Sequence, residues 1–204
     1  VEKEADMLHP LKPILGYTVQ ATDKPAGKVN DLLFDDVTWN IRHVVVGDPG
    51  GIGIQPASVD PANVAGVDNG ASRMNMKLTQ AEIAGGPDVS LDPPVSRSHT
   101  SASDPTLRSL DEVVGYKVVA SDGEVGTIAD LLAGDNDWKV HLVAVQSAGG
   151  PVLVGAGLID RFDHDNHSAH VELDKAGFAA SPAYDASKPP ASIDDVKLVG
   201  QKGV

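Results

Sequence analysis

The sequence predicts an all-β protein made of two tandem copies of a small β-barrel domain. The main observation is an internal repeat, because residues 15–46 recur 99 positions later as residues 114–145, with 13 of the 32 aligned positions identical and no gap. A match at a fixed offset over this length indicates a duplicated structural unit. A second observation is the alternation of short apolar runs with Gly, Asp, Asn and Pro turns, which is typical of small barrels.

The repeat also predicts the domain boundaries. We expect a first barrel with an N-terminal lead-in over residues 1–86, a linker over 87–106, a second barrel over 107–185 and a C-terminal tail over 186–204. Each copy is near the lower size limit for a self-sufficient core, and only 4% of the residues are aromatic. We therefore expect the copies to be related by a pseudo-twofold axis, so that equivalent patches face each other as in a C2 dimer.

The long strand of each copy contains a predicted irregularity. Val29 and Leu32 stand three apart, and the second copy repeats this spacing. Residues three apart point to opposite faces of a regular strand, so a β-bulge near Asp31 and Asp130 is the simplest explanation. The carboxylate is expected to cap the backbone of the bulge.

The other predicted elements also occur in equivalent pairs. They are strands at 44–46 and 143–145 that should be covered on both faces, strands at 50–55 and 151–154, hairpins over 64–78 and 159–173, and short helices capped by Thr79 and Asp174. The offset between the copies falls to 95 in this region. The second copy therefore lacks four residues, which we assign to the turn at 61–64.

The charge of the chain excludes some partners. The formal net charge is −13, from 16 Lys and Arg against 29 Asp and Glu, and the basic residues are scattered singly. Such a field repels a phosphate backbone, so we expect no nucleic-acid binding, whereas a basic protein surface would be attracted.

Cysteine content and hydropathy limit the class further. The chain has no cysteine, which excludes disulfides, thiolate metal sites and cysteine nucleophiles. No apolar run is long enough to span a bilayer, and the first ten residues do not resemble a signal peptide. We expect a soluble, cytoplasmic protein without a membrane span.

Both copies carry a pattern that resembles the PRC-barrel family. In the first copy the matching residues are Gly16, Tyr17, Asp23, Gly27, the run 31–36, Trp39, Ile41, Arg42 and the segment 94–97, and in the second they are Gly115, Tyr116, Asp122, Gly123, Gly126, Asp130 and Trp138. The second copy departs from the pattern at Ala133, Gly134 and His141.

The resemblance implies a fold and a general role. The PRC barrel is a small β-barrel named for the cytoplasmic domain of the photosynthetic reaction-centre H subunit, and it is also found in a ribosome-maturation factor. It implies a non-catalytic module for assembly and docking. The membrane helix of the H subunit and the partner domain of the maturation factor are absent from this chain, so neither specific role transfers.

The most concentrated group of candidate metal ligands is the segment 163–170. It contains His164, His167 and His170, whose imidazoles could ligate a metal together with neighbouring carboxylates. The three histidines cross a hairpin turn, however, and a turn does not force their side chains to converge. We favour a polar turn without metal and keep the metal site as the alternative.

Other candidate sites have simpler explanations. The glycine-rich segment 47–53 is followed by an alternating strand, whereas a phosphate-binding loop opens a helix, so a hairpin loop is favoured. The pair Ser98 and His99 lies in the linker, where no acid can orient the histidine. The adjacent carboxylates at 35–36 and 194–195 are interpreted as solvated turn residues.

The two tryptophans occupy equivalent positions. Trp39 and Trp138 each follow an acidic turn and precede an apolar strand. In domains so poor in aromatic residues, we expect both to fill the core rather than to anchor a partner.

Together these observations favour a non-catalytic binding or assembly module that docks onto a protein partner, for example in a complex at the cytoplasmic face of a membrane. No catalytic residue and no cofactor are predicted, and a homo-oligomer is compatible with the sequence. The alternative is a metal-binding protein or enzyme that uses the histidine-rich hairpin of the second copy.

Overall fold

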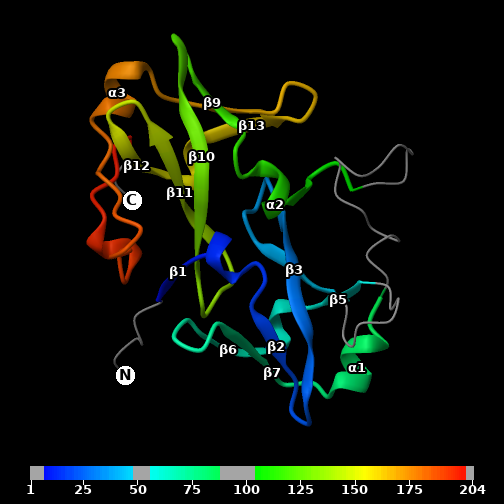
Figure 1. Cartoon of the computed structure of the whole chain (residues 1–204). Helices are drawn as coiled ribbons and strands as arrows, with labels where there is room; N and C mark the ends of the chain where they lie inside the picture. Colours follow the sequence, from blue (N-terminus) through cyan, green and yellow to red (C-terminus); the bar gives the residue numbers. More distant parts are fainter. Residues whose placement is uncertain (1–6, 48–55, 88–103, 201–204) are drawn as a thin grey trace. The chain divides into compact units, whose positions relative to one another are not determined.

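The computed structural model describes residues 7–47, 56–87 and 104–200. They divide into two compact units. We call Lys12–Asp111 the first unit, and Val1–Leu11 together with Glu112–Val204 the second unit. The secondary structure is mainly β, which confirms the predicted fold class at the level of two all-β units (Figure 1).

The first unit contains a seven-stranded sheet. Its strand order is β5-β4-β3-β2-β7-β6, and β8 also pairs with β3. The elements are η1 (Lys12–Ile14), β2 (Thr18–Gln20), β3 (Pro25–Asp35), β4 (Ile41–Gly47), β5 (Ala57–Val59), η2 (Pro61–Asn63), β6 (Val64–Asp68), β7 (Arg73–Met76), α1 (Gln80–Ala84) and β8 (Leu107–Ser109). The β2–β7 pairing is parallel.

The second unit repeats this order with equivalent strands. Its sheet runs β12-β11-β10-β9-β14-β13, and β1 also pairs with β10. The elements are β1 (Leu8–Pro10), β9 (Lys117–Ala120), β10 (Gly123–Gly134), β11 (Val140–Ser147), β12 (Gly150–Gly155), η5 (Ala156–Leu158), β13 (Ile159–Asp163), β14 (Ser168–Val171), α3 (Lys175–Ala179) and η6 (Ile193–Asp195). Helix α2 (Leu110–Val113) crosses the unit boundary.

The predicted bulge lies at the same place in both long strands. The register of β3 against β4 shifts between Val29 and Asp31, and that of β10 against β11 shifts between Ile128 and Asp130. The next backbone N–H donates to the aspartate in each copy, at 2.8 Å for Asp31 and 2.7 Å for Asp130. The carboxylate therefore caps the bulge, as the sequence predicted.

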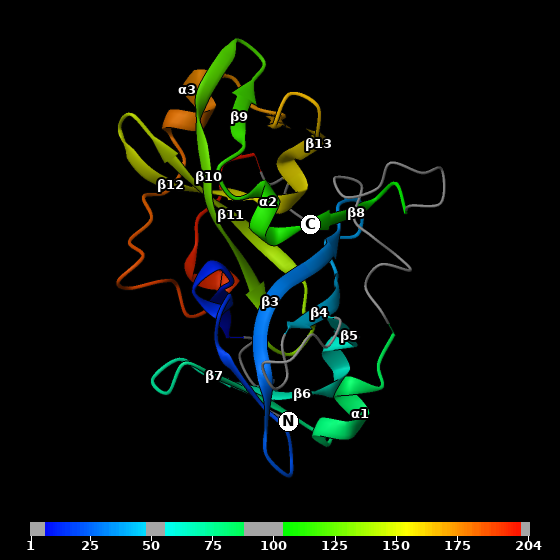
Figure 2. The same cartoon turned by 45° about the vertical axis from the view of Figure 1, so that its right-hand side comes forward.

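The strand that precedes each repeat joins the sheet of the other repeat. Leu8–Pro10, next to the first repeat in sequence, pairs with the end of β10, and Leu107–Ser109, next to the second repeat, pairs with the end of β3. Figure 2 shows β8 beside β3. We call β1 and β8 the exchanged strands.

This exchange changes the division of the chain expected from the sequence. The expected first barrel began at residue 1 and the second at residue 107, whereas the compact units assign Val1–Leu11 to the second unit and residues up to Asp111 to the first. The physical reason lies in the long strands. Strand β9 pairs with β10 only as far as Thr127, so the rest of that edge, beyond the bulge, is available for β1.

The four-residue difference between the copies does not lie in the turn at 61–64. Both copies keep a three-residue 3-10 turn there, η2 and η5. The strand pairs before the turn already follow the new offset, since Ala57 pairs with Val46 and Val152 pairs with Val145. The extra residues of the first copy therefore lie between β4 and β5.

Both predicted helix caps are present. The Thr79 side chain accepts from the Glu82 N–H, and Glu82 accepts from the Thr79 N–H at 2.7 Å, which completes a capping box. The Asp174 side chain accepts from the Gly177 N–H at 2.7 Å. The predicted hairpins correspond to β6–β7 and β13–β14.

Residues 186–200 of the C-terminal tail pack against the rest of the second unit. The sequence predicted a linker-like tail from residue 186, but Tyr184 belongs to a buried apolar cluster against which Ile193, Val196 and Leu198 pack. Three apolar side chains spaced along a polar segment are enough to hold it on the sheet. In the described ranges no helix combines the length and the apolar character that a membrane crossing requires.

Candidate functional site

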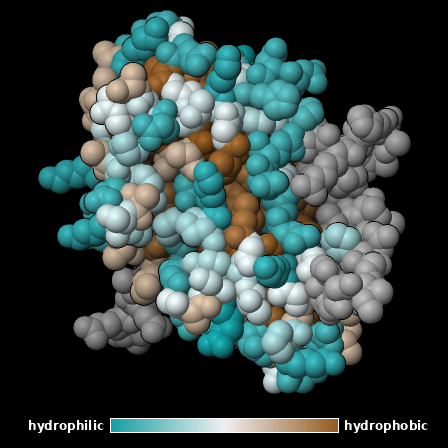
Figure 3. Space-filling model, in the orientation of Figure 1, coloured by the Kyte–Doolittle hydropathy of each residue, from teal (hydrophilic) through white to brown (hydrophobic). Residues whose placement is uncertain are grey.

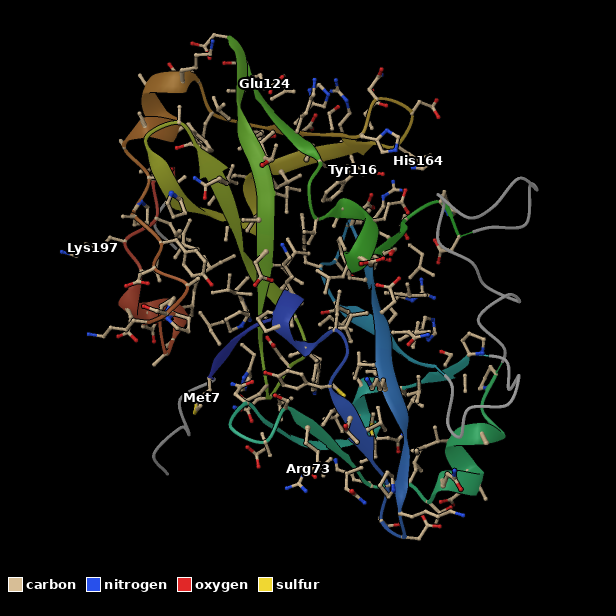
Figure 4. All side chains as sticks on the ribbon, viewed as in Figure 1. Met7, Arg73, Tyr116, Glu124, His164 and Lys197 are labelled. Carbon is tan, nitrogen blue, oxygen red and sulfur yellow. The ribbon has the colours of Figure 1, made fainter. Side chains whose placement is uncertain are left out.

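The histidine-rich hairpin forms a polar cluster with the segment around α2. Figure 4 shows His164, in the β13–β14 turn, beside Tyr116, which precedes β9. The Tyr116 hydroxyl donates to Glu112 Oε1 at 2.8 Å, and His164 Nδ1 lies 2.8 Å from the same oxygen. His167 packs its ring edge-on against Tyr116, with centroids 5.3 Å apart.

The three candidate histidines are not brought together. The ring centroids of His164 and His167 are 5.8 Å apart, whereas His170 lies on β14 with Nδ1 3.4 Å from a guanidinium nitrogen of Arg161. Within the described residues, no group of three or more His, Asp or Glu side chains could hold a metal ion. The cluster instead connects the hairpin to Glu112, which the sequence did not identify as a candidate.

The first unit has a simpler version of this cluster. Tyr17 occupies the position of Tyr116, and its hydroxyl donates to Asn69 Oδ1 at 3.3 Å, where the second copy has His164. Ser72 and His167 are also equivalent, and both have positive φ, of 49° and 47°. A contact between the tyrosine hydroxyl and the turn residue is therefore common to both copies, and the histidines are an addition of the second copy.

The groove that holds β1 is a second candidate site. We call it the β10 groove and define it by Asp130, Leu132, Asp135 and Ala144. The Leu11 N–H donates to Asp130 Oδ1 at 3.1 Å and to the Leu131 carbonyl at 2.9 Å.

The far end of β1 is held by the other carboxylate of the groove. Asp135 accepts from the Met7 N–H at 3.1 Å, and His9 Nε2 lies 3.5 Å from Asp135 Oδ2. Leu8 is buried against Leu132.

The equivalent β3 groove, defined by Asp31, Leu33, Asp36 and Val45, holds β8 through a hydroxyl and a guanidinium. The Ser109 hydroxyl donates to Asp31 at 2.5 Å, and Arg108 Nε donates to Asp36 at 2.7 Å. These two donors take the places of Pro10 and His9 in β1. Because a bond to a charged group is stronger than a neutral one, β8 is fastened more firmly by polar contacts.

A carboxylate network surrounds the start of β8. Asp104 accepts from the Thr106 backbone N–H and hydroxyl and pairs with Arg42, and these bonds lower the pKa of Asp104 to about 2. Burial acts to raise the pKa of Asp35, but bonds from Thr38, Thr106 and Val37 hold it below its ordinary value.

Burial has the larger effect at the neighbouring carboxylate. It raises the pKa of Asp36, against the lowering effect of Arg108. The pair 35–36 is therefore a set of hydrogen-bonded turn residues rather than solvated ones. The pair 194–195 lies in η6, where Asp195 forms a capping box with Ser192.

The prediction that both tryptophans fill the core is right for one of them. Trp39 is 6% exposed and stacks on Phe34, with centroids 5.6 Å apart and an interplanar angle of 14°. Trp138 is only half-buried, because Ala133 replaces the phenylalanine at the equivalent position and offers no ring to stack on. Both tryptophans have positive φ, of 64° and 48°, so the left-handed turn before the strand is shared.

Residues near the C-terminus line two hollows of the second unit. Two cavities of about 440 and 320 Å³ are lined mainly by residues of the tail and of β12 and η5. The Tyr184 hydroxyl is buried, and no hydrogen-bond partner for it occurs in the part of the chain that the structure describes. Burial, together with the charges of Asp130 and Asp185, raises the pKa of Tyr184 to about 12.

Two sequence candidates, the glycine-rich segment 47–53 after its first residue and the pair Ser98 and His99, lie outside the described residues, as does the predicted strand at 50–55. Strand β1 is not among the elements expected from the sequence, although a signal for it exists. Leu8 and Leu11 match Leu107 and Leu110 at the same 99-residue offset, so the repeat begins earlier than residue 15.

No protein-family model and no curated protein matches this chain. The site must therefore be interpreted from its own geometry.

Proposed function

We propose that the protein is a non-catalytic docking module, made of two PRC-type barrels, that binds a protein partner by accepting extended segments on its sheets. The observation that carries the proposal is the exchange of β1 and β8. Each sheet holds a strand from outside its own repeat through backbone pairing, a buried leucine and two flanking aspartates. Backbone pairing with pockets for alternate side chains is also how many domains recognise peptides.

The charge of the surface supports a partner with basic side chains. On the face shown in Figure 3, hydrophilic residues predominate, and the net charge of the whole chain is −13. Most acidic residues in the described candidate sites already have structural roles, such as capping turns and holding the exchanged strands. We propose a cytoplasmic location for this module and a partner in an assembly.

The test is capture of the partner from the native host, followed by reconstitution of the complex from purified components. We expect a saturable complex whose affinity falls as salt rises from 50 to 500 mM, because an acidic protein attracts a basic surface through screened charges. A full chain that forms no such complex with any captured protein would contradict the proposal.

The alternative function is a metal site at the histidine-rich hairpin, although the side chains near it do not form a group of three ligands within the described residues. A metal that binds the native state must raise the melting temperature by mass action. We expect zinc or nickel to leave the melting temperature unchanged. A saturable rise that disappears in His167→Ala, but persists in the first-copy control Ser72→Ala, would favour the metal-binding alternative.

A further inference from the structure

The two grooves have equivalent backbone pairing, and they differ in the side chains that the bound strand brings to them. Asp31 and Asp36 in the β3 groove correspond to Asp130 and Asp135 in the β10 groove. Their register is the same, since Leu33 pairs with Ser109 and Leu132 pairs with Pro10. A strand that suits one groove should therefore suit the other.

Strand β8 makes full use of its carboxylates. Together with Leu110, the first residue of α2, it reads Leu-Arg-Ser-Leu, and it places a guanidinium 2.7 Å from Asp36 and a hydroxyl 2.5 Å from Asp31. Both Leu107 and Leu110 are fully buried. The strand thus combines two apolar anchors with two charge-assisted hydrogen bonds.

Strand β1 brings different side chains to the same positions. Its sequence, Leu-His-Pro-Leu over residues 8–11, places an imidazole 3.5 Å from Asp135 and a proline ring where β8 has its serine hydroxyl. Proline also has no N–H with which to pair with the sheet. The β10 groove therefore keeps the two carboxylates, while its own strand brings neither a guanidinium nor a hydroxyl to them.

We propose that the β10 groove is the docking site for an extended partner segment of the Leu-Arg-Ser-Leu type, which displaces β1. This inference rests on the proposed docking function and names the chemistry of the partner. The partner's leucines would replace Leu8 and Leu11, its arginine would pair with Asp135, and its serine hydroxyl would donate to Asp130. Strand β8 makes the corresponding contacts in the β3 groove.

The partner segment must bind the β10 groove more tightly than β1 does. Strand β1 has an advantage in this competition because it belongs to the same chain. A tethered segment competes at an effective concentration in the millimolar range. A short peptide should therefore bind the native chain weakly, and binding should improve when β1 is loosened. Truncating Leu8 removes an apolar anchor of β1 and leaves the groove residues unchanged.

The experiment uses a fluorescent peptide with the sequence of residues 105–111, Pro-Thr-Leu-Arg-Ser-Leu-Asp, and the full-length chain. We expect the peptide to bind Leu8→Ala at least tenfold more tightly than the wild type. A matched truncation at an exposed position, Val37→Ala, at 71% exposure, should change nothing. Replacing the peptide's arginine by glutamate should weaken its binding to Leu8→Ala by at least tenfold.

A second measurement does not depend on a destabilising variant. The chain has no cysteine, so His9→Cys with Ala133→Cys, at positions that are paired in the sheet, can lock β1 in place by a disulfide. Oxidation should abolish peptide binding and reduction should restore it. Equal binding to the oxidised and reduced forms, or binding that tolerates the arginine-to-glutamate change, would overturn the proposal. If the peptide does not displace a captured protein, the partner binds elsewhere than in the β10 groove. That result would contradict this inference but not the proposed docking function.

Discussion

The first unit fastens its exchanged strand largely with charged and polar side chains, whereas the second unit does so largely with apolar cover. In the first unit, Arg108 pairs with Asp36 and Arg42 pairs with Asp104. At the positions of these two arginines the second unit has His9 and His141. The same backbone is therefore held by different interactions in the two copies.

The apolar cover of the second unit comes from two sources. Leu142 and Leu153 occupy positions where the first unit has His43 and Ser58. In the first unit, Ser58 Oγ and His43 Nδ1 are hydrogen-bonded at 2.8 Å. Tyr184 and three apolar residues of the tail, Ile193, Val196 and Leu198, add to this cover. Burial of one leucine stabilises by about 2 kcal/mol, and a hydrogen bond to a charged group by about as much, so duplicated sheets can exchange one for the other.

The largest effect should come from cutting the chain at the wrong boundary. A fragment of residues 12–111 contains all seven strands of the first sheet, whereas a fragment of residues 1–103 lacks β8 and carries β1 without its groove. We expect the first to fold cooperatively and the second to be mostly unfolded at 25 °C. Circular dichroism and urea titration will check this, and equal stability of the two fragments would mean that the exchange is energetically unimportant.

A smaller effect should separate the two tryptophans. Trp39→Ala removes a buried ring and its stack on Phe34, so we expect a loss of about 3–4 kcal/mol. Trp138→Ala removes a half-buried ring without such a stack and should cost about 1–2 kcal/mol. Urea denaturation followed by far-ultraviolet circular dichroism measures both. Equal costs would show that the stack contributes nothing beyond burial.

Acid should affect the first unit more than the second. The pKa of Asp104 is lowered to about 2 from an ordinary value of 3.8, and that of Asp35 is also lowered, so the unfolded state binds more protons between about pH 4 and pH 2. Their stabilising contribution is present above pH 4 and is lost as pH falls through that window. The second copy has Ala5 and Gly134 at these positions.

The measurement compares urea denaturation at pH 4.5 and 2.5, with Trp39 and Trp138 followed separately in single-tryptophan variants. The Trp39 signal should show the larger loss of stability. In Asp104→Asn, this loss should shrink. An unchanged loss in that variant would assign the acid sensitivity to other carboxylates.

The smallest effect should come from Tyr184→Phe. The tyrosine hydroxyl is buried and has no hydrogen-bond partner within the described residues, so its removal relieves a desolvation penalty. We expect the melting temperature of the second unit to stay the same or to rise by a few degrees, whereas Tyr116→Phe, which removes the bond to Glu112, should lower it. A clear loss of stability in Tyr184→Phe would reveal a bond from this hydroxyl.

Local patterns in the sequence determined much of the fold. The repeat, the bulges at Asp31 and Asp130, the hairpins and both helix caps could be predicted, because each depends on residues that are close in the chain or on a comparison between copies. Spacing along a strand also places side chains on a face. It does not tell which strand will lie on the next edge.

Only the tertiary structure decided which sheet each leading strand joins, what the tail covers, and which side chains meet. Leu8 and Gly134 pair across 126 positions of sequence, and Glu112 reaches His164 across 52. Such contacts depend on which edge and which apolar face remain open after the local elements have formed. Equivalent sequences fit both edges in this chain, so the choice between them is a property of the whole fold.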